Sequence, residues 1–287
     1  QGGAVFLTTG DSTTSASAGG YALEAVEGGF VTVSGTVGTR SFSVKILVEE
    51  VNAKLDVLNA NTFHASADVT LVLGIHNARL IGSAAIDATG NTSANTLEGN
   101  GARNLISGGS GNDRLIGGTG ADQHLGGDGR DVASYQLATS GVQADLTRVL
   151  TGTTRGEAAG DSFVSIENLI GSAHRDWLGG DALANVIWGL GGDDTLAGRA
   201  GNDTLLGGTG ADRFVFQRGD DTDRIRDFQD NVDTILLGGF AGVTSASTAL
   251  GHARQSGAHV VFDFGAGDVL VVENITLAAL RDDISIL

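Results

Sequence analysis

The fold is decided by the stretch Gly189–Val215, which reads GLGGDDTLA, GRAGNDTLL, GGTGADRFV. A second copy of this nine-residue pattern covers Gly108–Ser134 as GGSGNDRLI, GGTGADQHL, GGDGRDVAS. The glycines allow backbone angles that other residues avoid, and the aspartate in the sixth position offers oxygen to a hard cation. The first six residues of each repeat therefore predict a tight turn that holds an ion.

The last three residues of each repeat predict a short strand with one side chain in the core. That eighth position holds Leu115, Leu196, Leu205 and Phe214, with His124 and Ala133 as poorer fits. Because a three-residue strand buries little surface, successive repeats must stack to be stable. The pattern predicts an all-β protein, a parallel β-roll or β-helix solenoid with ion-binding turns.

Imperfect repeats extend both blocks upstream. Their sixth position holds Asn95, Asn104, Asp176 and Asn185, and their fourth position holds Ser93, Ala102, His174 and Leu183 in place of glycine. Because asparagine offers an oxygen without charge, we expect these repeats to bind a cation weakly or to act only as caps. Downstream, FQRGDDTDR keeps Asp221 in register but has Asp223 at its eighth position, so we expect the roll to end there.

The composition excludes several classes of protein. The 287 residues include 46 glycines and no proline or cysteine, and the net charge is −17. The lack of cysteine rules out disulfides, and the acidic balance without a basic stripe argues against nucleic acid as a partner. No run of 18 apolar residues is present, so we expect no transmembrane segment.

The remaining regions carry weaker patterns. In residues 1–89, VTVSGTV, VLNANTF and LIGSAAI repeat apolar residues six apart, which predicts coils of a parallel β-helix, with a β-sandwich as the alternative. We expect residues 90–135 and 171–223 to form the two roll blocks, residues 136–170 a bulging connection between them, and residues 224–287 an acidic and apolar C-terminal cap.

The nonamer GGxGxDxUx, with U apolar, resembles the calcium-binding repeat of RTX (hemolysin-type) proteins exported by type I secretion. The resemblance covers about Gly90 to Leu287 and implies several calcium ions, a secreted or cell-surface protein of a Gram-negative bacterium, and a tail read by the secretion machinery. In that family two nonamers make one coil, so loops two repeats apart share an ion. The resemblance therefore pairs Asp113 with Asp131, Asp176 with Asp194, Asp194 with Asp212, and Asn185 with Asp203.

The resemblance also implies a set of ligands. The side-chain ligands would be Asp113, Asp122, Asp131, Asp176, Asn185, Asp194, Asp203, Asp212 and Asp221. The main-chain carbonyl ligands would come from Gly108, Ser110, Gly117, Thr119, Gly126, Asp128, Gly189, Gly191, Gly207 and Thr209. Calcium is favoured over zinc, since no cysteine or histidine occurs at ligand spacing.

Two functions remain open at this point. No HExxH or GxSxG motif is present, so we favour a non-catalytic secreted protein with a structural, adhesive or self-assembling role, which binds copies of itself or cell-surface polysaccharide. The alternative is the calcium-folded C-terminal part of a secreted hydrolase or epimerase whose catalytic domain lies upstream. The opening QGGAVFLTTG, an uncharged strand-like stretch, predicts self-association through an open sheet edge.

Overall fold

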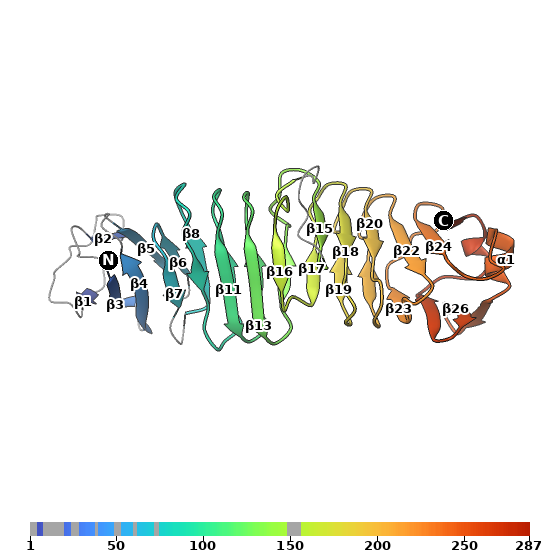
Figure 1. The fold of residues 1–287 in the computed structure, drawn as a ribbon, viewed down its shortest axis with the longest axis horizontal. Helices are drawn as coiled ribbons and strands as arrows, with labels where there is room; N and C mark the ends of the chain where they lie inside the picture. The colour runs from blue at the N-terminus through green and yellow to red at the C-terminus, as the bar shows by residue number, and fades with distance from the viewer. Residues whose placement is uncertain are drawn as a thin grey trace. The chain divides into compact units, whose positions relative to one another are not determined.

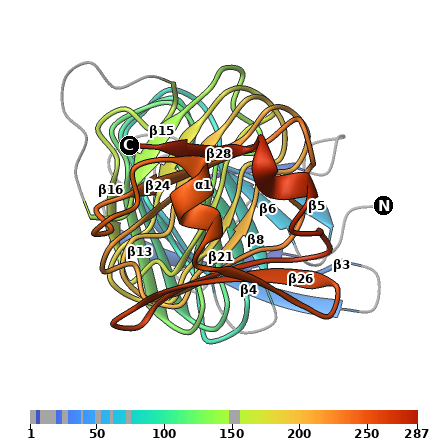
Figure 2. The same ribbon diagram turned by 90° about the vertical axis from the view of Figure 1, so that its right-hand side faces the viewer.

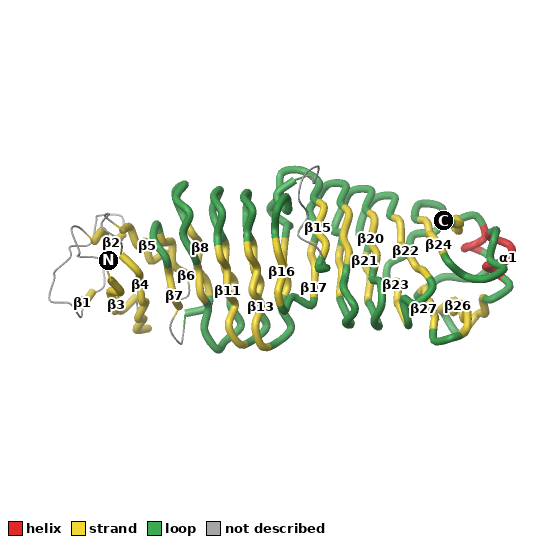
Figure 3. The backbone as a smooth tube through the Cα atoms, in the orientation of Figure 1, coloured by secondary structure: helices red, strands yellow, loops and turns green. Residues whose placement is uncertain are grey.

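The regular secondary structure of the described residues is nearly all β-strand, joined by turns and loops (Figures 1 and 3). The computed structural model describes residues 5–7, 20–23, 29–37, 40–48, 53–59, 62–71, 75–147 and 156–287. The chain divides into two compact units, one of Gln1–Ala133 with Gly160–Ile166 and one of Ser134–Ala159 with Glu167–Leu287. Within the described ranges, no helix is long and apolar enough to cross a membrane.

The first unit opens with antiparallel strands. Their bounds are β1 (Val5–Leu7), β2 (Gly20–Leu23), β3 (Gly29–Val37), β4 (Arg40–Val48), β5 (Ala53–Asn59), β6 (Thr62–Ala65) and β7 (Val69–Leu71). Antiparallel pairs join β1 to β3, β3 to β4, β4 to β7, β2 to β5 and β5 to β6. The prediction of parallel coils in residues 1–89 is therefore wrong for the part of the chain up to β6. Only two residues separate β3 from β4, whereas a parallel pair needs a crossover of a dozen or more.

Parallel coils begin where β6 pairs with β8 and β7 with β9. The strands that follow in this unit are β8 (Asn77–Leu80), β9 (Ala88–Thr89), β10 (Thr96–Glu98), β11 (Leu105–Ser110), β12 (Arg114–Ile116), β13 (Gln123–Asp128), β14 (Val132–Ser134) and β16 (Ser162–Val164). Leu97 lies opposite Leu115 in the β10–β12 pair, 18 residues away. Two nonamers therefore make one coil, and alternate repeats stack in the same sheet.

The second unit repeats this arrangement in two sheets. One has the order β15-β18-β20-β22-β24-β28, and the other contains β17-β19-β21-β23-β27-β26-β25. The bounds are β15 (Gln143–Asp145), β17 (Asn168–Ile170), β18 (Trp177–Gly179), β19 (Val186–Trp188), β20 (Thr195–Ala197), β21 (Thr204–Leu206), β22 (Arg213–Gln217), β23 (Thr222–Ile225), β24 (Thr234–Gly238), β25 (Ala253–Ser256), β26 (His259–Gly265), β27 (Asp268–Val272) and β28 (Ile284–Ile286). The short helices are α1 (Ala246–Leu250) and the 3₁₀ turn Ala279–Arg281. Figure 2 shows α1 beside β28 at the C-terminal end.

Stacking continues beyond the point where the sequence predicted its end. Leu205 lies opposite Ile225 in the β21–β23 pair, so this coil has 20 residues instead of 18. The two extra residues shift the register, and Ile225 takes the core position that the nonamer pattern gave to Asp223. Parallel pairing then goes on from β22 to β24, from β23 to β27 and from β24 to β28.

The core consists of columns of eighth-position side chains. Leu178, Leu196 and Phe214 lie opposite one another and are at most 1% exposed. The corresponding column in the first unit contains Ile106 and His124, both completely buried. Contact between successive coils through such columns supplies the apolar burial that a single repeat lacks.

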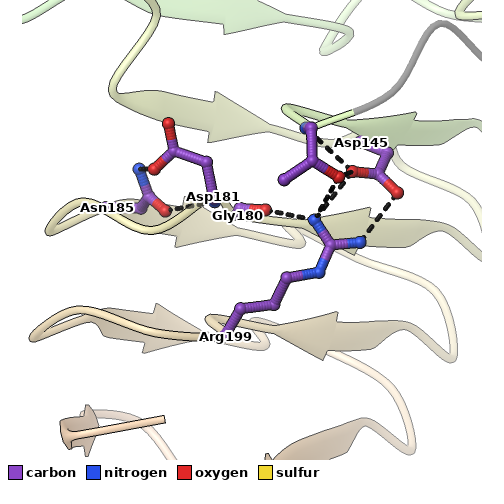
Figure 4. A network of polar contacts seen from close by, with 6 residues as sticks. Asp145, Gly180, Asp181, Asn185 and Arg199 are labelled. Atoms are coloured by element: carbon purple, nitrogen blue, oxygen red, sulfur yellow. Dashed lines mark hydrogen bonds and ion pairs between the residues drawn. The ribbon is translucent and has the colours of Figure 1, made fainter. Parts of the chain in front are cut away.

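An ion pair between a partly exposed arginine and a buried aspartate links the first strand of the predicted bulging connection to the coils of the second unit (Figure 4). Arg199 donates to both carboxylate oxygens of Asp145 at 2.7 Å and also to the carbonyl of Gly180. The guanidinium lies 5.8 Å from the centre of the Trp177 ring. Burial alone would raise the pKa of Asp145, but hydrogen bonds from Arg199 and Thr147 outweigh it and lower the pKa. The ion pair therefore keeps a carboxylate ionised inside the fold.

We expect Arg199→Ala to lower the free energy of unfolding by about 3–5 kcal/mol, because it leaves the Asp145 carboxylate buried without its partner. Arg224→Ala breaks the more exposed pair with Glu273 and should cost less than about 1 kcal/mol. Denaturant unfolding at saturating calcium measures both. Adding Asp145→Asn to Arg199→Ala should recover part of the loss, and equal effects of the two arginine substitutions would contradict this assignment.

Candidate metal centres

The turns between strands need glycine at defined places. The second and fourth residues of the complete nonamers have positive φ angles. Gly192 has a φ of 113°, outside the range of other residues, and a Cβ there would collide with the backbone of His174 in the previous coil. At the second position Leu190 and Arg199 adopt φ angles of 77° and 71°, which a side chain tolerates only with strain. Close stacking of the coils thus depends on the glycines.

The sixth-position aspartates form a ladder of hydrogen bonds along the roll. The amide of Asp176 donates to Oδ1 of Asp194 at 2.8 Å, and the amide of Asp194 donates to Oδ1 of Asp212 at 2.9 Å. In the first unit, Asp113 donates likewise to Asp131. On the opposite edge, Asn185 donates to Asp203. The structure therefore brings together each pair that the two-repeat coil predicts.

Six aspartates of the roll have a second oxygen without a hydrogen-bond partner in the described part of the chain. This holds for Oδ2 of Asp113, Asp122, Asp194, Asp203, Asp212 and Asp223, which are between 0 and 2% exposed. Such an arrangement is costly unless a cation pairs with the oxygen. Unpaired carboxylate oxygens in the turns fit the ligands that calcium prefers.

Main-chain oxygens lie close to the same carboxylates. At Gly189, the space that a Cβ would fill is crowded by Oδ2 of Asp194 and by the carbonyl oxygen of Gly207 in the next coil. The other expected glycine carbonyls, those of Gly108, Gly117, Gly126 and Gly189, occupy the same place relative to the preceding coil.

Among the third-position residues, the carbonyls of Asp128 and Thr209 accept the amides of Gly111 and Gly192 at 2.8 Å. Ser110 and Asp128 face each other in β11 and β13, and Gly191 bridges to Thr209. The Thr119 hydroxyl donates to the carbonyl of Gly101.

Burial shifts the acidity of the ladder. It raises the pKa of Asp122, Asp194 and Asp203 to about 7, and of Asp113 and Asp212 to about 6, from an ordinary value of 3.8. Burial and the neighbouring Asp203 raise the pKa of Asp223 to about 9. These carboxyls therefore resist ionisation unless positive charge is supplied.

The imperfect repeats satisfy their own polar groups. Oδ2 of Asp176 accepts the amide of Ser172 at 2.5 Å, and the Ser172 hydroxyl accepts the amide of His174. In the next repeat, Oδ1 of Asn185 accepts the amide of Asp181, whose carboxylate accepts the amide of Leu183. The repeats with Asn95 and Asn104 have the same side-chain turns, made by Asn91 and Asn100. In these repeats, side-chain hydrogen bonds hold the turn that glycines form in the complete nonamers. Asp176 and Asn185 therefore accept hydrogen bonds within their own loops, unlike the other expected ligands.

The ladder also includes residues that the nonamer pattern missed. Asp221 is exposed, and Asp223 takes its expected place by accepting the amide of Asp203 at 3.0 Å. Asp161 and Asp233 accept the amides of Asp122 and Asp212 in the same way. Each of the three stands two residues before an apolar residue of a strand, as in DSF, DRI and DTI. That shorter signal could have found them where the glycines are missing.

Comparison with known proteins agrees with this geometry. The family model of the RTX calcium-binding nonapeptide repeat matches four copies, over residues 89–124 and 188–223. The chain therefore carries RTX repeats, which bind calcium ions and indicate an extracellular, secreted protein in general. No curated protein sequence matches. Among solved structures, the extracellular lipase LipA from Serratia marcescens is similar at 17% identity, over 75% of this chain and 41% of the lipase, with a TM-score of 0.29. The chain thus spans less than half of that lipase.

We expect Asp194→Asn to have opposite effects with and without calcium. The amide keeps an oxygen for the amide of Asp176 but removes the charge, so at a calcium concentration about a hundredfold above the dissociation constant the loss of one site lowers stability by roughly 2.7 kcal/mol. Without calcium at neutral pH, the variant should be at least as stable as the wild type, because no buried carboxyl has to be kept neutral. Thermal melts measure the effect with calcium, and the residual β signal in circular dichroism measures the effect without it, with the exposed Asp230→Asn as control. Equal shifts for the two variants would refute the assignment.

The calcium-free protein should be more stable in mild acid than at neutral pH. The folded aspartates hold protons up to about pH 6–7, whereas the unfolded ones lose them near 3.8, so the folded state binds more protons and stability falls as the pH rises through this window. Burial lowers the pKa of His124 to about 4, which acts in the opposite direction but for one group only. The β signal in circular dichroism of the calcium-depleted protein from pH 5 to pH 8 checks the sign. A β signal that grows as the pH rises over this range would contradict it.

Proposed function

We propose that this protein is a secreted structural module that calcium folds outside the cell and that assembles through its open sheet edges at the cell surface or in the matrix. The observation that carries the proposal is the ladder of buried carboxylates whose second oxygens are unpaired. The six unpaired oxygens among the described residues carry a free-energy penalty at neutral pH that bound cations relieve. Calcium binding and folding of the roll are then thermodynamically coupled.

The affinity expected for such sites couples folding to location. Extracellular calcium modules have dissociation constants of roughly 10⁻⁴–10⁻³ M. These sites are empty in a cytoplasm poor in calcium and filled outside the cell. The chain would therefore stay unfolded before export, and we assign residues 224–287 to the region read by a type I secretion system.

The assembly part of the proposal rests on the ends of the sheets. β1 is the terminal strand of its sheet and β2 of the other, and each pairs on one side with a described strand. An unpaired strand edge is a template for another chain unless charge or proline blocks it. The residues of β1 are Val5, Phe6 and Leu7, which carry neither. Because a head-to-tail contact does not close on itself, the expected product is a filament or a sheet.

The experiment compares the purified chain with and without millimolar calcium. Circular dichroism should change from largely disordered to β-rich on calcium addition, and an unchanged spectrum in excess chelator would disprove the calcium-linked fold. Light scattering and electron microscopy of the same samples should show assembly only with calcium. Phe6→Lys should suppress assembly while leaving the calcium response intact. Leu183→Lys, at a loop residue 61% exposed, is the matched control and should assemble normally. A monodisperse monomer in both conditions would refute the assembly while leaving the calcium-linked fold to stand.

A further inference from the structure

One coil of the first unit departs from the oxygen-only chemistry of the ladder. Asp122, His124 and Asp161 bring their ligand atoms within 4.8 Å of one another. All three side chains are buried, with at most 1% exposed. Asp122 and His124 lie at the start of β13, and Asp161 directly precedes β16, which pairs with β13 in parallel. The parallel pairing of β13 with β16 thus brings two carboxylates and one imidazole together.

The place of His124 in the core is unusual. It occupies the eighth position, which other repeats fill with an apolar side chain, and it lies opposite Ile106 on one side and Phe163 on the other. Its ring meets that of Phe163 edge to face at 5.3 Å. An imidazole at this position places a nitrogen ligand of the kind that zinc binds beside the carboxylates of Asp122 and Asp161.

The loop glycine shows where the imidazole points. A Cβ on Gly117 would collide with Oδ2 of Asp122 and would stand 2.8 Å from Nε2 of His124. At Gly189 the corresponding space is bordered by the Asp194 carboxylate and by a glycine carbonyl of the next coil. In the Gly117 loop, the imidazole nitrogen therefore stands where other loops have a main-chain oxygen. Oδ2 of Asp122 is fully buried and lacks a hydrogen-bond partner in the described ranges, so it is aimed into this space unsatisfied.

The break in the repeat explains why this coil differs. The amide of Asp122 donates to Oδ1 of Asp161 at 2.8 Å, across 39 residues instead of the usual 18. Asp161 does not belong to a nonamer, so the facing turn lacks the glycine pattern that elsewhere supplies carbonyl oxygens. Calcium takes six to eight oxygen ligands, whereas a site with one imidazole and two carboxylates suits a smaller ion with fewer ligands.

We propose that Asp122, His124 and Asp161 bind one divalent transition-metal ion, preferably Zn²⁺, so that the Asp122 loop holds this ion in place of the calcium expected there while the other loops hold calcium. Imidazole and carboxylate together are ordinary zinc ligands, and three protein ligands leave a fourth position for water or a main-chain oxygen. The ion would join β13 to β16. It would thereby stabilise the coil that contains β16, the strand that follows the long connection and pairs with β13.

The test uses Co²⁺ as a visible probe for Zn²⁺, added to the full-length chain in saturating calcium. We expect one equivalent of Co²⁺ to bind with a d–d absorption band, to be displaced by Zn²⁺, and to leave the calcium content unchanged by elemental analysis. His124→Leu should remove the band and weaken binding by more than about tenfold. The leucine restores the apolar column, so the variant should fold and keep its calcium. His174→Ala removes an exposed imidazole and should keep the band.

Three results would overturn the proposal. These are the absence of Co²⁺ binding by the wild type, equal Co²⁺ binding by His124→Leu, and the loss of one calcium for each Co²⁺ bound. Asp161→Asn gives a second check, because its amide oxygen can still accept the amide of Asp122 while its charge is gone. It should weaken Co²⁺ binding and leave the calcium-induced circular dichroism change in place. Because calcium content and Co²⁺ absorption are read from one sample, failure of the zinc site and failure of calcium-linked folding are distinguishable.

Discussion

The hydrogen bond from a sixth-position amide to the aspartate one coil later is the interaction on which the roll depends. It fixes the spacing of the coils, because Oδ1 is used for the backbone of the preceding coil. It also determines the electrostatics, because the same carboxylate then holds Oδ2 buried and without a partner. Structural stacking and cation binding are thus two uses of one side chain, one through each carboxylate oxygen.

The loops fall into two kinds that differ in what satisfies this second oxygen. Where glycine occupies the fourth position, as in Gly192, the turn leaves the oxygen unpaired and a cation must balance it. Where another residue occupies it, as in His174 or Leu183, a side-chain turn brings an amide of the same loop to the aspartate or asparagine. In the imperfect repeats the turn before the strand is therefore held by side-chain hydrogen bonds of the loop itself.

The sequence predicted the features that follow from strict periodicity. The nonamer pattern predicted Leu196 and Phe214 as core residues, and the resemblance to RTX repeats implied the two-repeat coil and the pairing of Asp194 with Asp212. The prediction failed where spacing changed. Two inserted residues moved the ladder position from Asp221 to Asp223, and 39 residues separate Asp122 from Asp161. Alternating strands such as β3 and β4 look alike in parallel and antiparallel sheets, and only the short connection between them requires the antiparallel direction. His124 was passed over as a poor core residue, because its acidic neighbour in the next coil could not be located from the sequence.

The self-satisfied loops have a consequence for the order of events during folding. They stand at the upstream side of both glycine-rich blocks, at Asn95 and Asn104 and again at Asp176 and Asn185. A coil that needs no ion can form first and offer its strands as a template, so each later coil adds to an existing edge and avoids the entropic penalty of starting a new one. Nucleation would then be insensitive to calcium and propagation sensitive to it. The ion concentration would set how far along the chain the ordered region extends, and the roll would unwind from its glycine-rich coils toward these two fixed starting points when calcium is withdrawn.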